Sequence, residues 1–226
     1  MRVGGGQTPS AHCSTEVKAY NLQNEDREMD DHDREMNDEE MKQWARNEVE
    51  HFEQFKNVDH ASRLAKAVHH GQTDSAGIDY MNHIEAVVKS VRPLGYLFVI
   101  VAYLHDTIED TKHKKKRKAL KELILESFGS QIFDAVIAIT KRPDQDYFKD
   151  YLPQVANNPV ALVVKVADMQ VNLDRSLKEQ VNLARGLKEE DEDPNNKLRL
   201  LRISKYQAGL EYFGSIIATR YHMEEN

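Results

Sequence analysis

The chain contains the run Tyr103-Leu104-His105-Asp106-Thr107-Ile108-Glu109-Asp110-Thr111, which directly follows the apolar residues 97–102. On a helix, with about 100° per residue, the side chains of His105, Asp106, Glu109 and Asp110 fall within an arc of roughly 140°. One face of an otherwise apolar helix then carries an imidazole and three carboxylates. Two interpretations stay open: a solvated polar face behind a core segment, or a buried site in which a positive charge offsets the carboxylates.

A divalent metal ion is the natural source of that positive charge. His and Asp side chains are ready metal ligands, and a bound cation reverses the local charge balance. Two side chains from one helix cannot complete a coordination shell, so other segments must supply ligands. His69 and His70 lie upstream, and Asp168 follows the apolar segment 161–167. An Asp in that position is capped, paired or bound to a metal, and the residues alone do not decide among these.

From residue 57 onward the chain has a helical pattern almost throughout. Apolar residues recur at three- and four-residue spacing near residues 59–71, 80–92, 95–110, 117–127, 130–141, 146–156, 159–174 and 195–221. Strand-like alternation is nearly absent. The run 161–167 could pass for a buried strand, but its helical surroundings favour a core helix. The sequence therefore predicts an all-α fold.

The N-terminal quarter differs from the rest in its charge. Residues 1–56 contain 7 Lys and Arg against 14 Asp and Glu, whereas residues 57–226 contain 24 of each. The whole net charge of −7 therefore belongs to the first part. We expect residues 1–37 to form a disordered acidic tail, whose deletion leaves activity intact, and residues 38–56 an accessory helix. Residues 57–226 would then form the functional domain.

Composition restricts the classes of function. A chain of 226 residues, 40% of them hydrophobic, supports one domain with a real core. No run has the length of a membrane span, the first residues lack the apolar segment of a signal peptide, and the single cysteine, Cys13, excludes an intramolecular disulfide. We therefore expect a cytoplasmic protein. The neutral charge of residues 57–226 argues against broad nucleic-acid binding, while the oligomeric state stays open.

Several motifs of the chain match a known family. These are His69-His70-Gly71-Gln72, Tyr80-Met81-Asn82-His83, the run 105–111, and Lys165-Val166-Ala167-Asp168 followed by Asn172-Leu173. In order and spacing they resemble the HD-domain hydrolases of the RelA/SpoT type, which cleave the alarmone (p)ppGpp. The resemblance covers roughly residues 58–175 and includes Phe128-Gly129 and Ile139-Thr140-Lys141. It implies an HD-domain helical bundle with a metal site in its core.

The resemblance also implies roles for individual residues. The usual metal of the family is Mn²⁺, one ion per chain, and its ligands here would be His69, His105, Asp106 and Asp168. Glu109 and Asp110 match the acidic pair that assists the attack of water, and Asn172 and Lys165 are assigned to substrate binding. The reaction would convert (p)ppGpp and water to GDP or GTP and pyrophosphate. The expected partner is a small-molecule nucleotide.

The chain departs from the family pattern near the nucleotide pocket. The family usually has Gly-Glu-Pro-Tyr-x-x-His-Pro, and this chain reads Ala76-Gly77-Ile78-Asp79-Tyr80-Met81-Asn82-His83-Ile84. Met169 stands where an Arg usually follows the last Asp. The base of the substrate therefore stays open, and ppApp or a 5′-deoxynucleotide monophosphate is the alternative. A catalytically idle binding or regulatory module is a third hypothesis, from another class.

Two further features have no assigned role. The basic run Lys112-His113-Lys114-Lys115-Lys116-Arg117-Lys118 is either a solvated loop or an electrostatic collar that attracts an anionic substrate. Residues 170–179 are repeated almost unchanged as 180–189, which suggests a duplication that lengthens a helix or loop. Asn182 repeats Asn172 but lacks an Asp four residues before it, so we favour Asn172 as the nucleotide contact.

Overall fold

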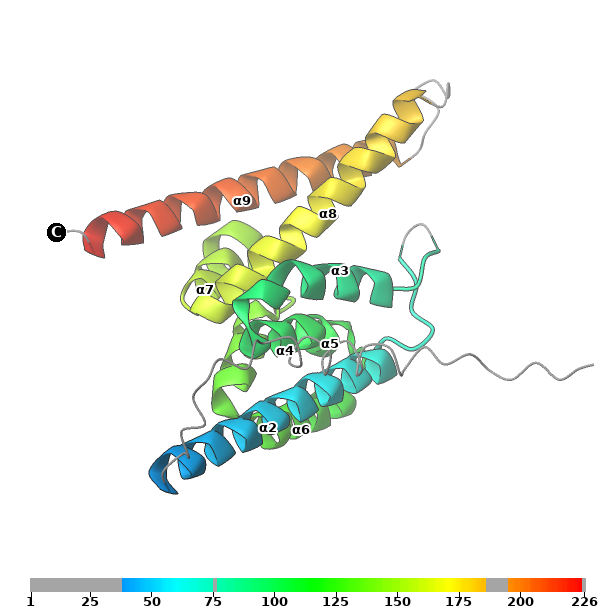
Figure 1. Cartoon of the computed structure of the whole chain (residues 1–226). Helices are drawn as coiled ribbons and strands as arrows, with labels where there is room; N and C mark the ends of the chain where they lie inside the picture. The colour runs from blue at the N-terminus through cyan, green and yellow to red at the C-terminus, as the bar shows by residue number, and fades with distance from the viewer. Residues whose placement is uncertain (1–37, 75–76, 186–194, 225–226) are drawn as a thin grey trace, which may run out of the picture. The chain divides into compact units, whose positions relative to one another are not determined.

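The computed structural model describes residues 38–74, 77–185 and 195–224 (Figure 1). The chain divides between Asn47 and Glu48 into two units. The described part of the first unit is the beginning of helix α2 (Asp38–Val68), and the second unit holds the other helices. The expected disordered tail, residues 1–37, lies outside the described residues.

The described residues form helices, and their one β-bridge joins Thr73 to Asp79. After α2 follow α3 (Met81–Val91), the 3₁₀ turn η1 (Arg92–Leu94), α4 (Tyr96–Leu104), α5 (Thr107–Asp110), α6 (Lys114–Ile139), the π-helical turn η2 (Tyr147–Tyr151), α7 (Leu152–Ala156), α8 (Pro159–Arg185) and α9 (Asn196–Glu224). The all-α prediction is confirmed, and the segment 161–167 lies in α8 as a helix. None of the helices in the described ranges combines the length and apolar character that crossing a bilayer requires.

Of two helix boundaries expected from the sequence, one falls inside a continuous helix and the other is confirmed as a break in the helical backbone. The segments 38–56 and 59–71 join in α2, which contains neither Gly nor Pro to end a helix between them. The segments 117–127 and 130–141 join in α6, where Gly129 has a φ of 78°. Because glycine adopts this left-handed backbone at little cost, Gly129 interrupts the helix as expected, and the interruption is a kink.

The core of the second unit is built around α4 and α8. Residues Val99 to Leu104 of α4 are all buried, as expected for a helix that is apolar all round. Helix α8 packs against α3, α4, α6, α7 and α9, and in Figure 1 α3 and α9 lie on different sides of it. Helix α3 buries one face, which contains His83, Ile84, Val87, Val88 and Val91. This packing brings α3, the end of α4 and the middle of α8 together.

His105 and Asp106 lie between two helices rather than inside one. Helix α4 ends at Leu104, and the short α5 begins at Thr107. The Thr107 hydroxyl donates to the Leu104 carbonyl oxygen (2.7 Å), which satisfies an acceptor at the end of α4. The single polar face expected on a continuous helix is therefore divided, with the His–Asp pair at the break and the acidic pair on α5.

Candidate metal centre

Histidine and aspartate side chains from three regions of the second unit meet in one group. His83 comes from α3, His105 and Asp106 from the break after α4, and Asp168 from α8. One potential ligand atom from each of His83, His105 and Asp106 lies within 4.8 Å of the others. Asp168 Oδ1 lies 3.1 Å from His83 Nε2 and 3.9 Å from His105 Nε2. We call these four side chains the His–Asp group.

The His–Asp group has the features of a metal-binding site. His83, His105 and Asp168 are buried, with 5%, 1% and 4% of their surface exposed. The Nδ1–H of His105 donates to the Ala102 carbonyl oxygen (2.7 Å), while its buried Nε2 lies 3.0 Å from Asp106 Oδ2. A histidine that anchors one ring nitrogen to a backbone oxygen and turns the other towards carboxylates is typical of metal ligands. The donor set therefore fits a divalent cation.

The charges of the group favour cation binding. Burial raises the pKa of Asp106 and of Asp168, but nearby positive charges outweigh it, chiefly His105 for the first and Lys165 for the second. Both carboxyl groups therefore have a pKa well below the usual range and stay ionised. Burial lowers the pKa of His105, but the two aspartates raise it to about 9. A metal ion in this group would take the place of the His105 proton.

Neighbouring side chains hold the two aspartates in position. The Tyr80 hydroxyl donates to Asp106 Oδ2. Lys165 Nζ donates to Asp168 Oδ2 (2.8 Å), and Asn172 Nδ2 donates to Asp168 Oδ1 (2.6 Å). Residues three and four apart share a helix face, so α8 presents Lys165, Asp168 and Asn172 together. Hydrogen bonds of this kind orient metal ligands and increase metal affinity.

The group differs from the ligand set expected from the sequence in one residue. His105, Asp106 and Asp168 come together as expected, but His83 stands where His69 was expected. His69 Nδ1 lies 2.8 Å from Gln72 Oε1 and 3.7 Å from Asp110 Oδ2. His69 follows the end of α2 at Val68, and its buried Nε2 has no hydrogen-bond partner among the described residues.

The sequence did contain a signal for His83. His83 precedes Ile84 and lies four residues before Val87, so it shares the buried stripe of α3. A histidine in such a stripe needs a polar partner inside the core. The family motif in residues 69–72 was more conspicuous than this apolar stripe, and for that reason His69 was assigned as the ligand.

The acidic pair lies on α5, next to the His–Asp group. Glu109 Oε2 accepts the backbone N–H of Lys141 (3.0 Å), and Asp110 Oδ2 accepts a hydrogen bond from Gln72 Nε2 (2.7 Å). Desolvation raises the pKa of both carboxyl groups above the ordinary value. The shift brings them closer to the range in which a carboxylate accepts a proton at neutral pH.

A cavity of about 260 Å³, here called the catalytic pocket, borders the His–Asp group. Asp106, Asp168, Glu109 and Asn172 line it. The remaining lining residues are four cations and four tyrosines: Lys141, Lys165, Arg175, Lys205, Tyr80, Tyr147, Tyr151 and Tyr206. Positive side chains around a site for a divalent cation favour an anionic ligand such as a phosphate ester.

The cations of the catalytic pocket are held by neighbouring groups. Arg175 donates to Asp74 Oδ2 and to Asn172 Oδ1, both at 2.9 Å. Lys205 Nζ lies 4.0 Å from the centre of the Tyr147 ring. Desolvation, and then the charge of Lys165, lower the pKa of Lys205. Sequence reasoning assigned no role to Arg175 or Lys205, because no local pattern marks them, whereas Lys141 belonged to a segment that resembled the family.

The fold and the site together define a class of domain. It is an all-α domain with a buried group of histidines and aspartates that suits a divalent metal ion. No family model matches the chain.

Curated proteins of the RelA/SpoT type are similar to part of the chain. It is 29% identical over 126 residues to a probable GTP pyrophosphokinase of Mycobacterium leprae, a match that covers 51% of this chain and 15% of that protein. It is 28% identical over 123 residues to the bifunctional (p)ppGpp synthase/hydrolase SpoT of Escherichia coli K12, covering 54% of this chain and 17% of SpoT. The same figures apply to the guanosine-3′,5′-bis(diphosphate) 3′-pyrophosphohydrolase of Escherichia coli O157:H7. The match thus spans less than a fifth of these relatives, and the resemblance to RelA/SpoT-type HD hydrolases is confirmed.

One solved structure is also similar, described as "A metazoan ortholog of SpoT hydrolyzes ppGpp and plays a role in starvation responses". The likeness has a TM-score of 0.48 at 18% sequence identity, and it covers 73% of this chain and 95% of that one.

Proposed function

We propose that the chain hydrolyses the 3′-pyrophosphate of guanosine alarmones, converting (p)ppGpp and water to GDP or GTP and pyrophosphate. The observation that carries this proposal is the position of the His–Asp group, which borders a pocket lined by Glu109 and four cations. Such a pocket suits a reacting group with several negative charges. The similarity to relatives described as SpoT and as a 3′-pyrophosphohydrolase supports the choice of substrate.

We assign the metal site to His83, His105, Asp106 and Asp168, with one Mn²⁺ per chain as the expected ion. Imidazole and carboxylate ligands suit Mn²⁺, although they also suit other divalent ions of the first transition row. When bound, the ion supplies Lewis acidity, which lowers the pKa of a water molecule and neutralises charge that develops on the phosphate. His69 is then a supporting residue, because its ring bonds to Gln72, which in turn bonds to Asp110.

The residues around the ion have distinct roles in this proposal. Glu109 lines the catalytic pocket and accepts the proton of the attacking water. Asp110 orients the acidic pair through its bond to Gln72. Lys165 and Asn172 hold Asp168 and also face the substrate. The oxygen of water bonds to phosphorus as the bond between phosphorus and the ribose 3′ oxygen breaks, so that the 3′ oxygen takes a proton and leaves as a hydroxyl group, and pyrophosphate is released.

The second candidate is the same chemistry on another nucleotide, either ppApp or a 5′-deoxynucleotide monophosphate. Two observations favour it. Met169 is fully buried, and its thioether lies directly beneath Gly209 of α9, so that position offers no cation to the substrate. Arg175, which lines the catalytic pocket, forms an ion pair with Asp74, two residues before the segment where the chain departs from the family pattern. Both features affect substrate recognition rather than the metal site.

A product assay tests the proposed function. Purified full-length protein is incubated with ppGpp or ppApp, in Mn²⁺ or in EDTA, and products are separated by ion-exchange chromatography. GDP and pyrophosphate that appear with Mn²⁺ alone would support the first candidate, and turnover of ppApp alone would support the second. Protein that contains metal yet turns over neither compound would refute the alarmone hydrolase and leave the monophosphate substrates to be assayed.

A further inference from the structure

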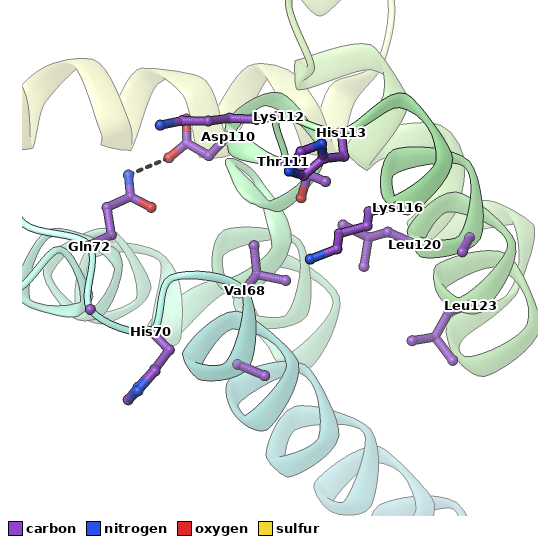
Figure 2. A pocket seen from close by; sticks show the side chains of 13 residues that line it. Val68, His70, Gln72, Asp110, Thr111, Lys112, His113, Lys116, Leu120 and Leu123 are labelled. Carbon is purple, nitrogen blue, oxygen red and sulfur yellow. Dashed lines mark hydrogen bonds between the residues drawn. The ribbon is translucent and has the colours of Figure 1, made fainter.

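A second cavity, of about 820 Å³, lies between the end of α2 and the beginning of α6 (Figure 2). Its lining residues come from the ranges 67–72, 110–113 and 116–123. It shares no lining residue with the catalytic pocket. The volume falls within the range of roughly 300–1,000 Å³ that small-molecule sites occupy. We call it the α2–α6 cavity.

One part of the α2–α6 cavity is positively charged. Lys112 and Lys116 line it, and neither forms an ion pair within the described part of the chain. Figure 2 shows the ammonium end of Lys116 pointing from α6 towards Val68 of α2. His113, which precedes the first turn of α6, also lines the cavity, and the beginning of a long helix favours anions. An imidazole can donate a hydrogen bond to an anion even when it is neutral.

The basic run 112–118 therefore divides into groups with different surroundings. Arg117 donates to the Thr111 carbonyl oxygen at 3.1 and 3.0 Å, and Lys118 lies 3.7 Å from Glu122. Lys114 and Lys115 are exposed and do not line the cavity. Lys112 and Lys116 are thus the lysines of the run that line the cavity.

Another part of the same cavity is apolar. Val68, Leu120 and Leu123 line it, and Leu123 is 40% exposed. A simple inorganic anion gains nothing from such a wall, whereas the flat base of a nucleotide gains from covering it. The combination of an apolar wall with two lysines fits a ligand that has an aromatic ring at one end and phosphates at the other.

We propose that the α2–α6 cavity is a second, regulatory site that binds a nucleoside polyphosphate. Lys112 and Lys116 bind its phosphates, and its base packs against Val68, Leu120 and Leu123. The site communicates with the catalytic pocket through Gln72 and Asp110. Both residues line the cavity, they are joined by a hydrogen bond of 2.7 Å (Figure 2), and Asp110 belongs to the acidic pair. Binding itself does not depend on the proposed hydrolase activity.

Calorimetric titration with GTP tests the site without any need for turnover. The full-length protein first receives Lys141→Gln and Lys205→Gln, which weaken phosphate binding in the catalytic pocket. Into this background we introduce either Lys112→Gln with Lys116→Gln, or the control pair Lys114→Gln with Lys115→Gln. Both pairs remove two positive charges from the same part of the chain, so they differ only in whether the lysines line the cavity. Equal melting temperatures would show that all variants fold.

We expect GTP to bind the background variant, and the cavity pair to weaken this binding at least about tenfold, since each charge-assisted hydrogen bond contributes strongly. The control pair should change it less than about twofold. Absence of binding in the background variant, or an equal loss from both pairs, would overturn the proposal. Leu123→Ser should weaken the binding of GTP but not of inorganic pyrophosphate. Equal effects on the two ligands would overturn the placement of the base.

Discussion

The catalytic pocket and the α2–α6 cavity both adjoin α5, but they hold their charged side chains in different ways. In the smaller pocket, Lys165 is paired with Asp168, Arg175 with Asp74, and Lys205 lies over the ring of Tyr147. In the larger cavity, Lys112 and Lys116 have no ion pair within the described residues. One set of charges is fixed before a ligand arrives, and the other is free to adapt to one.

This difference matches two different tasks. A reacting phosphate requires fixed donors, because groups that must reorganise during the reaction lose their effect on the transition state. A ligand that only binds can order flexible lysine side chains as it arrives, at a cost in side-chain entropy. Substitutions in the smaller pocket should therefore change the hydrolysis reaction itself, through kcat or KM. Those in the larger cavity should act mainly on binding.

The largest expected effect distinguishes His83 from His69 as the metal ligand. His83→Gln should abolish metal binding and turnover, because His83 belongs to the His–Asp group. His69→Gln should keep the metal and lose no more than the ~10–100-fold that removal of a supporting partner costs. Elemental analysis of both purified proteins, beside their turnover rates, decides the point. Metal retained in His83→Gln and lost in His69→Gln would restore His69 as the ligand.

Substitutions of the acidic pair, Glu109 and Asp110, should have the next largest effect. The two residues line different cavities, so their substitutions can be compared. Glu109 lines the catalytic pocket, whereas Asp110 lines the α2–α6 cavity. Glu109→Gln should reduce kcat by about 10²–10⁴, the usual contribution of a proton acceptor, with metal content unchanged. Asp110→Asn keeps an oxygen that can accept from Gln72 and should reduce kcat less. Steady-state rates at saturating substrate give the comparison, and a larger loss in Asp110→Asn would reverse the assigned roles.

The pocket cations should act on substrate binding. Lys141→Gln and Lys205→Gln should each raise KM by about tenfold, the effect of losing one charge-assisted hydrogen bond, and change kcat less. Exposed Lys114 lines neither cavity, so Lys114→Gln is the matched control with the same loss of charge. Initial rates over a range of substrate concentrations separate KM from kcat. An equal rise of KM in the control would mean that overall charge, rather than contact, governs binding.

The sequence predicts the helices well where its pattern is local. Helix α3 appears close to the expected range 80–92, and α8 begins at the expected residue 159 but continues to Arg185, beyond the expected end at 174. His105, Asp106 and Asp168 were likewise predictable, since polar side chains at the end of apolar runs need partners. His83 and His69 are both histidines near helix ends, and only packing in three dimensions shows that His83 lies beside Asp168 and Asp106 while His69 lies beside Asp110.

The lining of the catalytic pocket shows the limit of such reasoning. Lys141, Lys165 and Lys205 follow or lie on three different helices, α6, α8 and α9. Nothing in the sequence near Lys205 indicates that it approaches the other two. The same limit applies to the basic run 112–118, whose members look equivalent in the sequence. The start of α6 at Lys114 decides which of them line a cavity, because it sets the direction of each side chain.

The smallest expected effect concerns the exposed members of that run. Lys114 and Lys115 line neither cavity, so any influence they have on an anionic substrate must act through long-range attraction. Such attraction is screened within about 8 Å at physiological ionic strength. Replacing both with Gln should therefore lower kcat/KM by about twofold in dilute buffer, and by nothing measurable once salt screens the charges. Rates of wild type and variant measured across a salt series give this comparison. A loss of kcat/KM that persists at high salt would show that these lysines contact the substrate directly. No loss at any salt concentration would show that they are solvated surface residues without influence on the substrate.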